Sequence, residues 1–254
     1  MNKNEIIEKL YKNKLKNIST IGVIENYGIK SSLKDKDSFL ITVKTDHLWC
    51  YPAAENEKEL KNLLNKFRFK TLYFASLENW MLPVLTENRE IDWQLKTERL
   101  ILPEKDEMNL LLQNNVNKNR KILETETEVE IRAIQNKDVN FIFAHSHYQE
   151  FTSKEYIRER IEADCSAGII IKGDLAAWGL THDDGAVGFI HVRKKFRGRG
   201  FAQLITENLI RDKRKNNRDV FLNVELDNSK AKKLFYSLGF KFDREISWIK
   251  LSAE

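Results

Sequence analysis

A run of cations interrupted by two glycines is the stretch of this sequence best suited to chemistry. It reads VRKKFRGRGFA and spans residues 192–202. It follows an apolar run over residues 186–190 and precedes residues 203–210, whose apolar positions share one helical face. The context is therefore strand, turn and helix start, where backbone N–H groups lack partners and the helix dipole is positive. Such a turn can bind phosphate, and Gly198 and Gly200 let the backbone approach an anion closely.

The spacing of the turn decides which phosphate ligand it fits. A P-loop requires a Lys followed by Ser or Thr at its end, and no such pair follows here. A dinucleotide-binding turn requires a third glycine, where this sequence has Gln203. Both nucleotide-binding patterns are disfavoured, so the turn is predicted to bind a multiply phosphorylated ligand of another kind.

Two motifs together resemble the GNAT (GCN5-related) N-acetyltransferase superfamily. The first resembles its acetyl-CoA pyrophosphate loop, (Gln/Arg)-x-x-Gly-x-(Gly/Ala) after a strand ending in Val, and spans residues 195–200 with Lys in the first place. The second is a strand, an Asn, an Ala three residues later, an aromatic-Tyr pair and Gly-Phe, over residues 224–240. The resemblance covers about residues 128–254, and Trp178 and the Gly185 turn extend it to the glycine N-acyltransferase-like branch.

The resemblance implies direct attack of an amine on the thioester of acetyl-CoA, the co-substrate, with no covalent enzyme intermediate. Pantetheine would lie against the strand that ends at Val192, and backbone N–H groups from Arg197 to Ala202 would hold the pyrophosphate. Tyr236 falls at the position of the tyrosine that reprotonates the CoA thiolate. Asn228 either caps its helix and also binds pantetheine, or caps the helix alone. The implied cofactor-binding residues are Ile190, His191, Val192, Lys195, Arg197, Gly198, Arg199, Gly200, Phe201, Ala202, Asn228 and Tyr236.

The proton acceptor departs from the resembled pattern. Many relatives carry a Glu on the fourth strand, which in the glycine N-acyltransferase-like branch would fall near Ala186, and this strand has no carboxylate. Asp184 lies at the mouth of the strand, and His191 lies within it with an ordinary pKa of about 6.5, which suits a base. The alternatives are His182, Glu225 and a chain of water molecules. The predicted catalytic residues are Tyr236, His191 and Asp184.

The composition fits a globular enzyme. At 254 residues with 41% hydrophobic content, the chain can form one large or two ordinary domains. Its net charge of +5 gathers between Arg193 and Arg218, around the predicted phosphate site, which argues against general nucleic-acid binding. The apolar runs are too short to span a membrane, and the polar start is unlike a signal peptide. Cys50 and Cys165 show no metal or disulfide spacing, so we expect a cytoplasmic protein without metal.

For residues 128–254 the resemblance implies an α/β (α+β) fold of the GNAT type, with a mixed central sheet flanked by helices. The apolar periodicity predicts strands over 129–134 and 220–224, a hairpin over 168–180, and helices after Ser153 and Asn228. Residues 240–251 alternate and are expected to form a final hairpin.

Residues 1–115 predict a smaller α/β domain, joined to the second by a polar linker over residues 116–127. Its expected role is structural or dimer-forming, or it supplies one wall of the acceptor pocket, and a degenerate GNAT-like half is one interpretation. The predicted helices are 4–16 and 55–67, and the predicted strands are 18–24, 38–43, 47–51, 91–95 and 98–102.

Two functions from different classes follow from these patterns. The favoured one is an acyl-CoA-dependent N-acyltransferase that transfers acetyl to a primary amine of a small molecule or amino acid. The alternative is a non-catalytic acyl-CoA-binding or regulatory protein, for which the missing strand carboxylate and the extra domain leave room. Nucleic-acid binding is weaker, because the aromatic residues of the basic stretch, Phe196 and Phe201, are explained by the loop. The pattern leaves the acceptor, the acyl length and a homodimer open.

Overall fold

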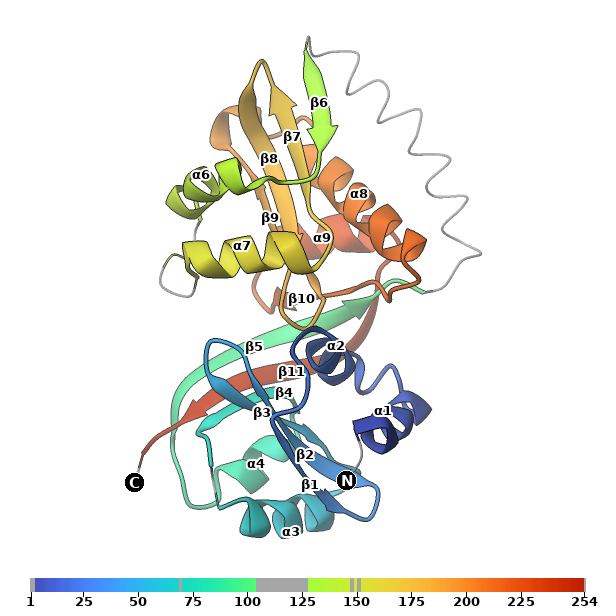
Figure 1. Ribbon diagram of the computed structural model, residues 1–254, viewed down its shortest axis with the longest axis vertical. Coiled ribbons are helices and arrows are strands. Elements are labelled where there is room, and N and C mark those ends of the chain that lie inside the picture. The colour runs from blue at the N-terminus through green and yellow to red at the C-terminus, as the bar shows by residue number, and fades with distance from the viewer. Residues whose placement is uncertain (1–2, 69, 104–127, 147–148, 150–151, 254) are drawn as a thin grey trace.

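The computed structural model describes residues 3–68, 70–103, 128–146, 149 and 152–253. Two lobes lie one above the other, and the long strands β5 (Ile91–Ile101) and β11 (Lys241–Leu251) cross between them (Figure 1). The predicted linker, residues 116–127, lies outside the described residues.

The first half builds a four-stranded sheet segment with helices around it. Its elements are α1 (Lys3–Lys12), α2 (Ile18–Tyr27), β1 (Ser31–Asp35), β2 (Ser38–Lys44), β3 (Leu48–Ala53), α3 (Glu57–Phe67), β4 (Tyr73–Glu78), α4 (Met81–Leu85) and β5. Leu60, Leu63 and Leu64 face the core from α3, as their helical spacing predicts.

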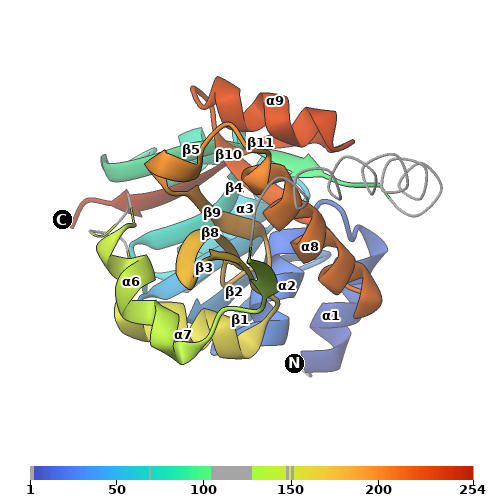
Figure 2. The same cartoon turned by 90° about the horizontal axis from the view of Figure 1, so that it is seen from above.

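The second half follows the order that the sequence predicts for a GNAT fold. Its elements are β6 (Val129–Arg132), η1 (Asn136–Asp138), α6 (Val139–Ala144), α7 (Lys154–Ala163), β7 (Ala167–Ile171), β8 (Asp174–Thr181), β9 (Val187–Val192), η3 (Lys194–Phe196), α8 (Phe201–Lys215), β10 (Phe221–Glu225), α9 (Ser229–Ser237) and β11. Helices α6 and α7 lie on one side of strands β6–β9, and α8 lies on the other (Figure 2).

The two halves repeat one order of elements and share one sheet. From α1 to β5, the first half matches the run α6, α7, β7, β8, β9, α8, β10, α9, β11 in the second. The shared sheet has the order β1-β2-β3-β4-β11-β5-β10, so the last strand of each half lies between the last two strands of the other. Strand β11, from the predicted second domain, therefore completes the sheet of the first.

One difference between the halves matters for binding. In the first half, β3 and β4 pair in parallel, with Trp49 opposite Tyr73 and Cys50 opposite Phe74. The equivalent strands of the second half, β9 and β10, are described in full and do not pair with each other: β9 ends the four-stranded sheet β6-β7-β8-β9, and β10 ends the seven-stranded one. The second half therefore leaves open a sheet edge that the first half closes.

Three predictions of secondary structure were wrong. The predicted strand 18–24 is helix α2, whose residues are buried on nearly all sides, so no polar face reveals the helical period. The predicted strands 91–95 and 98–102 are one strand, β5, which pairs with β11 throughout. The predicted hairpin over 240–251 is the single strand β11 between β4 and β5. Both errors of strand length arise because each strand finds its partners in the other half.

Candidate functional site

The glycine turn after β9 folds as an anion cradle. Gly198 and Gly200 adopt φ of 79° and 80°, the left-handed region that glycine favours. A Cβ at Gly198 would meet no atom within 4 Å, so the turn stands open at this point. Helix α8 begins at Phe201 with no side-chain cap on its N-terminus. Its first N–H groups and its dipole are therefore available to an anion.

Basic side chains surround this turn, and some of them pack against the ring of Phe196. Phe196 is buried, while Lys195, Arg197 and Arg199 are exposed around it. The Arg199 guanidinium lies 5.5 Å from the Phe196 ring centre, and Arg197 Nε donates to the Val192 carbonyl at 3.1 Å. Lys195 Nζ donates to Asp174 at 2.8 Å. The Phe201 side chain is buried in the core, so only its backbone can face a ligand.

Helix α3, the equivalent of α8 in the first half, has an N-terminus that disfavours anion binding. Helix α3 begins after Asn56, whose side chain accepts the Glu59 N–H at 3.0 Å and caps the helix. Its first turn carries Glu57 and Glu59, and no glycine lies in the turn before it. A capped terminus with two acidic residues repels phosphate, whereas the α8 terminus attracts it.

Strand β9 presents its free edge beside a local distortion. Phe189 has φ of 51°, and the β8–β9 register shifts between Trp178 and Leu180. Such a bulge ends regular pairing and redirects backbone groups, and a bulky residue in this conformation is strained. Ile190 and Val192 pack into the core beneath α8. The His191 ring stacks on Trp178 at 4.3 Å and therefore lies on the side of α6 and α7.

Tyr236 meets a carboxylate from the other half. Its side chain is 45% exposed on α9, and its hydroxyl donates to Glu98 Oε2 at 3.4 Å, a long hydrogen bond. Glu98 lies on β5, and Lys232 Nζ donates to its other oxygen at 2.6 Å. Burial first, and then the Glu98 charge, raise the pKa of Tyr236, so the phenol stays protonated at neutral pH. Asn228 caps α9 by accepting the Ala231 N–H at 3.1 Å.

Asp184 lies in a different environment from the one predicted. It is 3% exposed, and its Oδ1 accepts the Ala186 N–H at 3.0 Å within the β8–β9 turn. Its backbone packs on α2, because a Cβ at Gly22 would lie 1.9 Å from the Asp184 carbonyl oxygen. This geometry favours a structural role for Asp184 over the predicted catalytic one.

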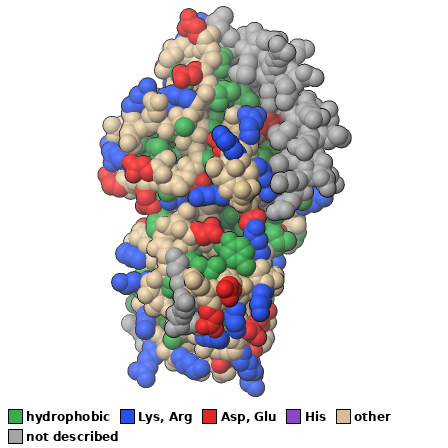
Figure 3. Space-filling model, turned by 45° about the vertical axis from the view of Figure 1, so that its right-hand side comes forward, with side chains coloured by type: hydrophobic (Ala, Val, Ile, Leu, Met, Phe, Trp, Pro, Cys, Tyr) green, Lys and Arg blue, Asp and Glu red, His purple; other side chains and the backbone are tan. Residues whose placement is uncertain are grey.

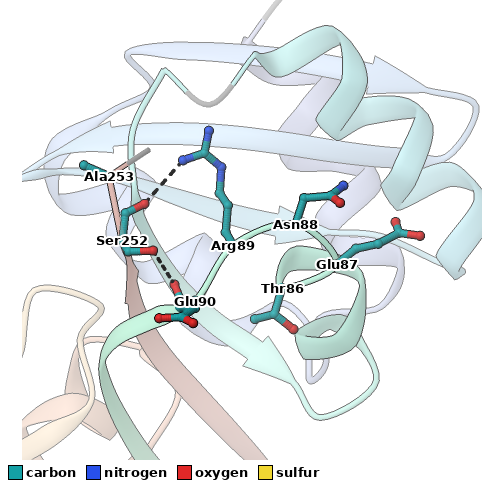
Figure 4. Close-up of a pocket in the computed structure, with 7 residues that line it drawn as sticks. All are labelled: Thr86, Glu87, Asn88, Arg89, Glu90, Ser252 and Ala253. Atoms are coloured by element: carbon teal, nitrogen blue, oxygen red, sulfur yellow. Dashed lines mark hydrogen bonds between the residues drawn. The ribbon is translucent and has the colours of Figure 1, made fainter.

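Two hollows on the described surface lie away from the glycine turn. One, of about 420 Å³, is lined by residues 86–90, Ser252 and Ala253, with Arg89 Nη1 donating to the Ser252 carbonyl across it (Figure 4). The other, of about 430 Å³, lies between the halves and includes the exposed side chains of Leu15 and Phe242. Hydrophobic surface is visible where the lobes meet (Figure 3). Neither hollow includes a residue that the sequence predicts for the site.

The described residues form neither a metal-binding cluster nor a membrane-spanning helix. Within them, no group of three His, Cys, Asp or Glu side chains is arranged to hold a metal ion. No described helix combines the length and the apolar character needed to cross a membrane. Cys50 and Cys165 are free thiols, and burial raises the pKa of Cys165 to about 12, so it is not a reactive thiolate.

A part of the second half matches a known protein family by sequence. A family model described as FR47-like protein matches residues 166–249. No curated protein matches the chain by sequence.

Several solved structures share the fold over nearly the whole chain. A Drosophila protein superposes with a TM-score of 0.73 at 13% identity, covering 99% of this chain and 97% of its own. A GCN5-related N-acetyltransferase-like protein from Streptococcus suis gives 0.58 at 12% identity, with 99% and 100% covered. A tandem GNAT protein from the clavulanic acid biosynthesis pathway gives 0.54 at 10% identity, with 100% and 97% covered. The chain therefore has the mixed α/β fold of GNAT proteins, as predicted.

The structure places the predicted residues 190–202 on β9, in the glycine turn and at the start of α8, and it places Glu98 beside Tyr236. The turn from Lys195 to Ala202 lies between the end of β9 and the start of α8. Glu98 was missed, because it lies far away in the sequence and only the pairing of β5 with β10 brings it beside α9. No local signal in the sequence marks that pairing.

Proposed function

We propose that the protein is an acyl-CoA-dependent N-acyltransferase that transfers acetyl from acetyl-CoA to a primary amine of a small molecule or amino acid. One observation carries this proposal: the unpaired edge of β9 leads directly into the uncapped N-terminus of α8. An unpaired strand can take up an extended, amide-containing chain, and the helix terminus can take up its phosphates. Pantetheine and pyrophosphate are joined in this order in CoA.

The residues of the second half suit this ligand. The backbone from Arg197 to Ala202 supplies N–H donors for the pyrophosphate, and Lys195, Arg197 and Arg199 supply positive charge. The backbone from Ile190 through His191 to Val192 supplies the edge for pantetheine. Bound acetyl-CoA supplies the acyl group, and the protein contributes orientation and proton transfer.

The first half serves as a degenerate copy in this proposal. It repeats the order of the elements, but its β3–β4 edge is paired and its α3 terminus is capped and acidic. We therefore expect one acyl-CoA per chain, bound to the second half. The proposed site also includes the two remaining cofactor-binding predictions, Asn228, which caps α9, and Tyr236 within α9.

Thermal unfolding with acetyl-CoA tests the cofactor site. A ligand at about 100 times its Kd stabilises the folded state by about 2.7 kcal/mol. This stabilisation is expected in the wild type and absent in Gly198→Glu, which puts a negative side chain into the cradle. Gly28→Glu is the matched control, because Gly28 also has a positive φ, 76°, and open space around its Cβ position. Loss of the shift in both variants, or its persistence in Gly198→Glu, would contradict the proposed site.

Catalysis separates the enzyme from a non-catalytic acyl-CoA-binding protein. The second candidate is supported by the strand β9, which carries no carboxylate at its edge. Release of the CoA thiol from acetyl-CoA, followed across a panel of primary amines, decides between the two. Amine-dependent release supports the transferase, whereas a thermal shift without any release supports a binding protein.

A further inference from the structure

The turn between β8 and β9 lies against the first half of the molecule. Asn26 of α2 donates its side-chain N–H to the Asp183 carbonyl at 2.7 Å. Gly22 of the same helix packs directly on the Asp184 carbonyl. The turn therefore holds His182 and Asp183 at the junction of the two halves.

Aromatic side chains connect this turn to the bulge of β9. The rings of His182 and Tyr156 lie 4.8 Å and 5.9 Å from the ring of Phe189. A Cβ at Gly188 would lie 2.1 Å from His182 Nε2, so the imidazole covers the backbone directly before the bulge. The cluster thus packs on the face of β9 that α7 covers, beside the bulge at Phe189.

The charges of this cluster are not balanced. Arg160 is 1% exposed, donates to the His182 carbonyl at 3.0 Å, lies 5.3 Å over the Tyr27 ring, and leaves its Nε without a hydrogen-bond partner. Asp184 is 3% exposed, and its Oδ2 also has no partner. The Asp183 side chain accepts the amide N–H of Asp184 at 3.2 Å. The Arg160 guanidinium forms its ion pair with Glu159, at 3.3 Å, so the carboxylates of Asp183 and Asp184 have no ion-pair partner among the described residues.

The titration of the cluster agrees with this imbalance. Burial first, and then the Asp184 charge, raise the pKa of Asp183 to about 7. Burial, followed by the Asp183 charge, raises the pKa of both Tyr51 and Tyr156, so the Asp183 carboxylate acts on phenols from both halves. Burial lowers the pKa of His182, which leaves the imidazole neutral and able to accept a proton.

We propose that this junction is the acceptor site, in which Asp183 binds the ammonium group of an organic amine and His182 takes up its proton. Tyr27 and Tyr51 from the first half, with Tyr156 and Phe189, surround the body of the amine. The site rests on the proposed acyltransferase function and deepens it. The first half then supplies one wall of the acceptor site, one of the two roles that the sequence left open for it.

The proton balance of the step is complete. The ammonium group loses one proton to His182, which passes it to solvent. The amine nitrogen then forms the N–C bond as the C–S bond breaks, and Tyr236 supplies a proton to the sulfur. The nitrogen loses its second proton to solvent, and the Tyr236 phenolate takes up one proton from solvent, which restores the enzyme. The products are an amide, the CoA thiol and one proton in solution.

Other groups around Asp183 set its pH response. They are Asn26 and Tyr27 from α2, Asp46 and Tyr51 at β3, Tyr156, Glu159 and Arg160 from α7, and His182 and Asp184 from the turn. Arg160 opposes the rise in the Asp183 pKa, and Asp46 and Asp184 favour it. Asp183 is therefore ionised above about pH 7 and protonated below it, so the affinity for an ammonium ion falls as the pH drops through this value.

Binding of phenethylamine to the CoA-saturated protein tests the site without turnover. Thermal unfolding should show stabilisation by phenethylamine and none by the uncharged 2-phenylethanol. The Asp183→Asn variant should bind the amine about 10–100-fold more weakly, since a hydrogen bond to a charged group is lost. Asp37→Asn, which removes an exposed carboxylate from the turn between β1 and β2, is the control and should bind as the wild type does.

The shift produced by CoA alone distinguishes this proposal from the proposed function. This thermal shift should be the same in the wild type, Asp183→Asn and Asp37→Asn. Its absence in the wild type would contradict the proposed acyltransferase function itself. If Asp183→Asn does not fold, the pH dependence of phenethylamine binding to the wild type replaces it. Equal stabilisation by amine and alcohol, no stabilisation by the amine, or undiminished binding in Asp183→Asn or at pH 5 overturns the acceptor site.

Discussion

Tyr236 and Glu98 show at the residue scale how the first half acts on the predicted proton donor of the second. The Glu98 carboxylate accepts the phenol hydrogen and is held by Lys232. A phenol must be protonated to donate, so the rate is expected to fall as the pH rises through the pKa of Tyr236. Because the negative charge of Glu98 contributes to raising that pKa, Glu98 extends the pH range in which Tyr236 can act.

Replacing Glu98 by Gln should therefore lower the pKa of Tyr236. The expected result is a shift of the alkaline limb of the kcat profile to lower pH, with the affinity for acetyl-CoA unchanged. Glu245→Gln is the matched control, because Glu245 lies opposite Glu98 on β11 but is bonded to Lys96 and Asn79. An alkaline limb that stays in place in Glu98→Gln would show that Tyr236 is not the group that titrates.

Helix α2 determines the position of the β8–β9 turn at the scale of elements. Gly22 is the point of closest approach, since any Cβ there would collide with the carbonyl of Asp184. Alanine is favoured over glycine inside a helix by about 1 kcal/mol, whereas overpacking a tight contact costs about 1–3 kcal/mol. The collision is with backbone that cannot rotate away, so the cost is expected to exceed the gain.

Gly22→Ala should destabilise the protein by about 1–2 kcal/mol in urea unfolding. It should also weaken phenethylamine binding, because the turn carrying His182 and Asp183 must move, while the shift produced by CoA persists. Ser19→Ala in the same helix is the control: Ser19 is buried with an unpartnered hydroxyl, so its removal should be neutral or stabilising. A Gly22→Ala variant as stable as the wild type would show that the backbone at Asp184 can move away from the added methyl group at little energetic cost.

The sequence predicts those elements whose signals are local. The glycine turn, the cap at Asn228 and the hairpin around Gly173 each have a signal within about ten residues of sequence. The structure confirms the local conformation of all three. Helix α2 was not predicted, because burial on nearly all sides removes the alternation of apolar and polar residues that marks a helix. The partners of β5 and β11 and the position of Glu98 depend on strand pairing across the two halves. The position of Asp183 depends on the packing of α2 against the β8–β9 turn. No short stretch of sequence encodes either kind of contact.

At the scale of the whole molecule, each half completes the other. Leu100 and Leu102 of the first half pack in the core of the second, and Ile249 and Leu251 of β11 pack in the core of the first. Between the strands, Arg99 is fully buried and bonds Asp243 at 2.7 Å and the Leu15 carbonyl at 2.9 Å. Neither half has a complete sheet alone, so we expect the chain to unfold in a single transition.

The exchange of strands leads to a prediction for the divided chain. Fragments 1–115 and 116–254 separate within the part of the sequence that joins the halves, and they keep β5 on one fragment and β11 on the other. Each fragment alone leaves apolar core and an unpaired sheet edge exposed, and should be insoluble or unfolded. Produced together, the two should copurify as a 1:1 complex that acetyl-CoA stabilises, because all of the pairings of β5 and β11 can re-form. Circular dichroism of fragment 116–254 is the deciding measurement, and a folded, acetyl-CoA-binding fragment would show that the second half does not need the first.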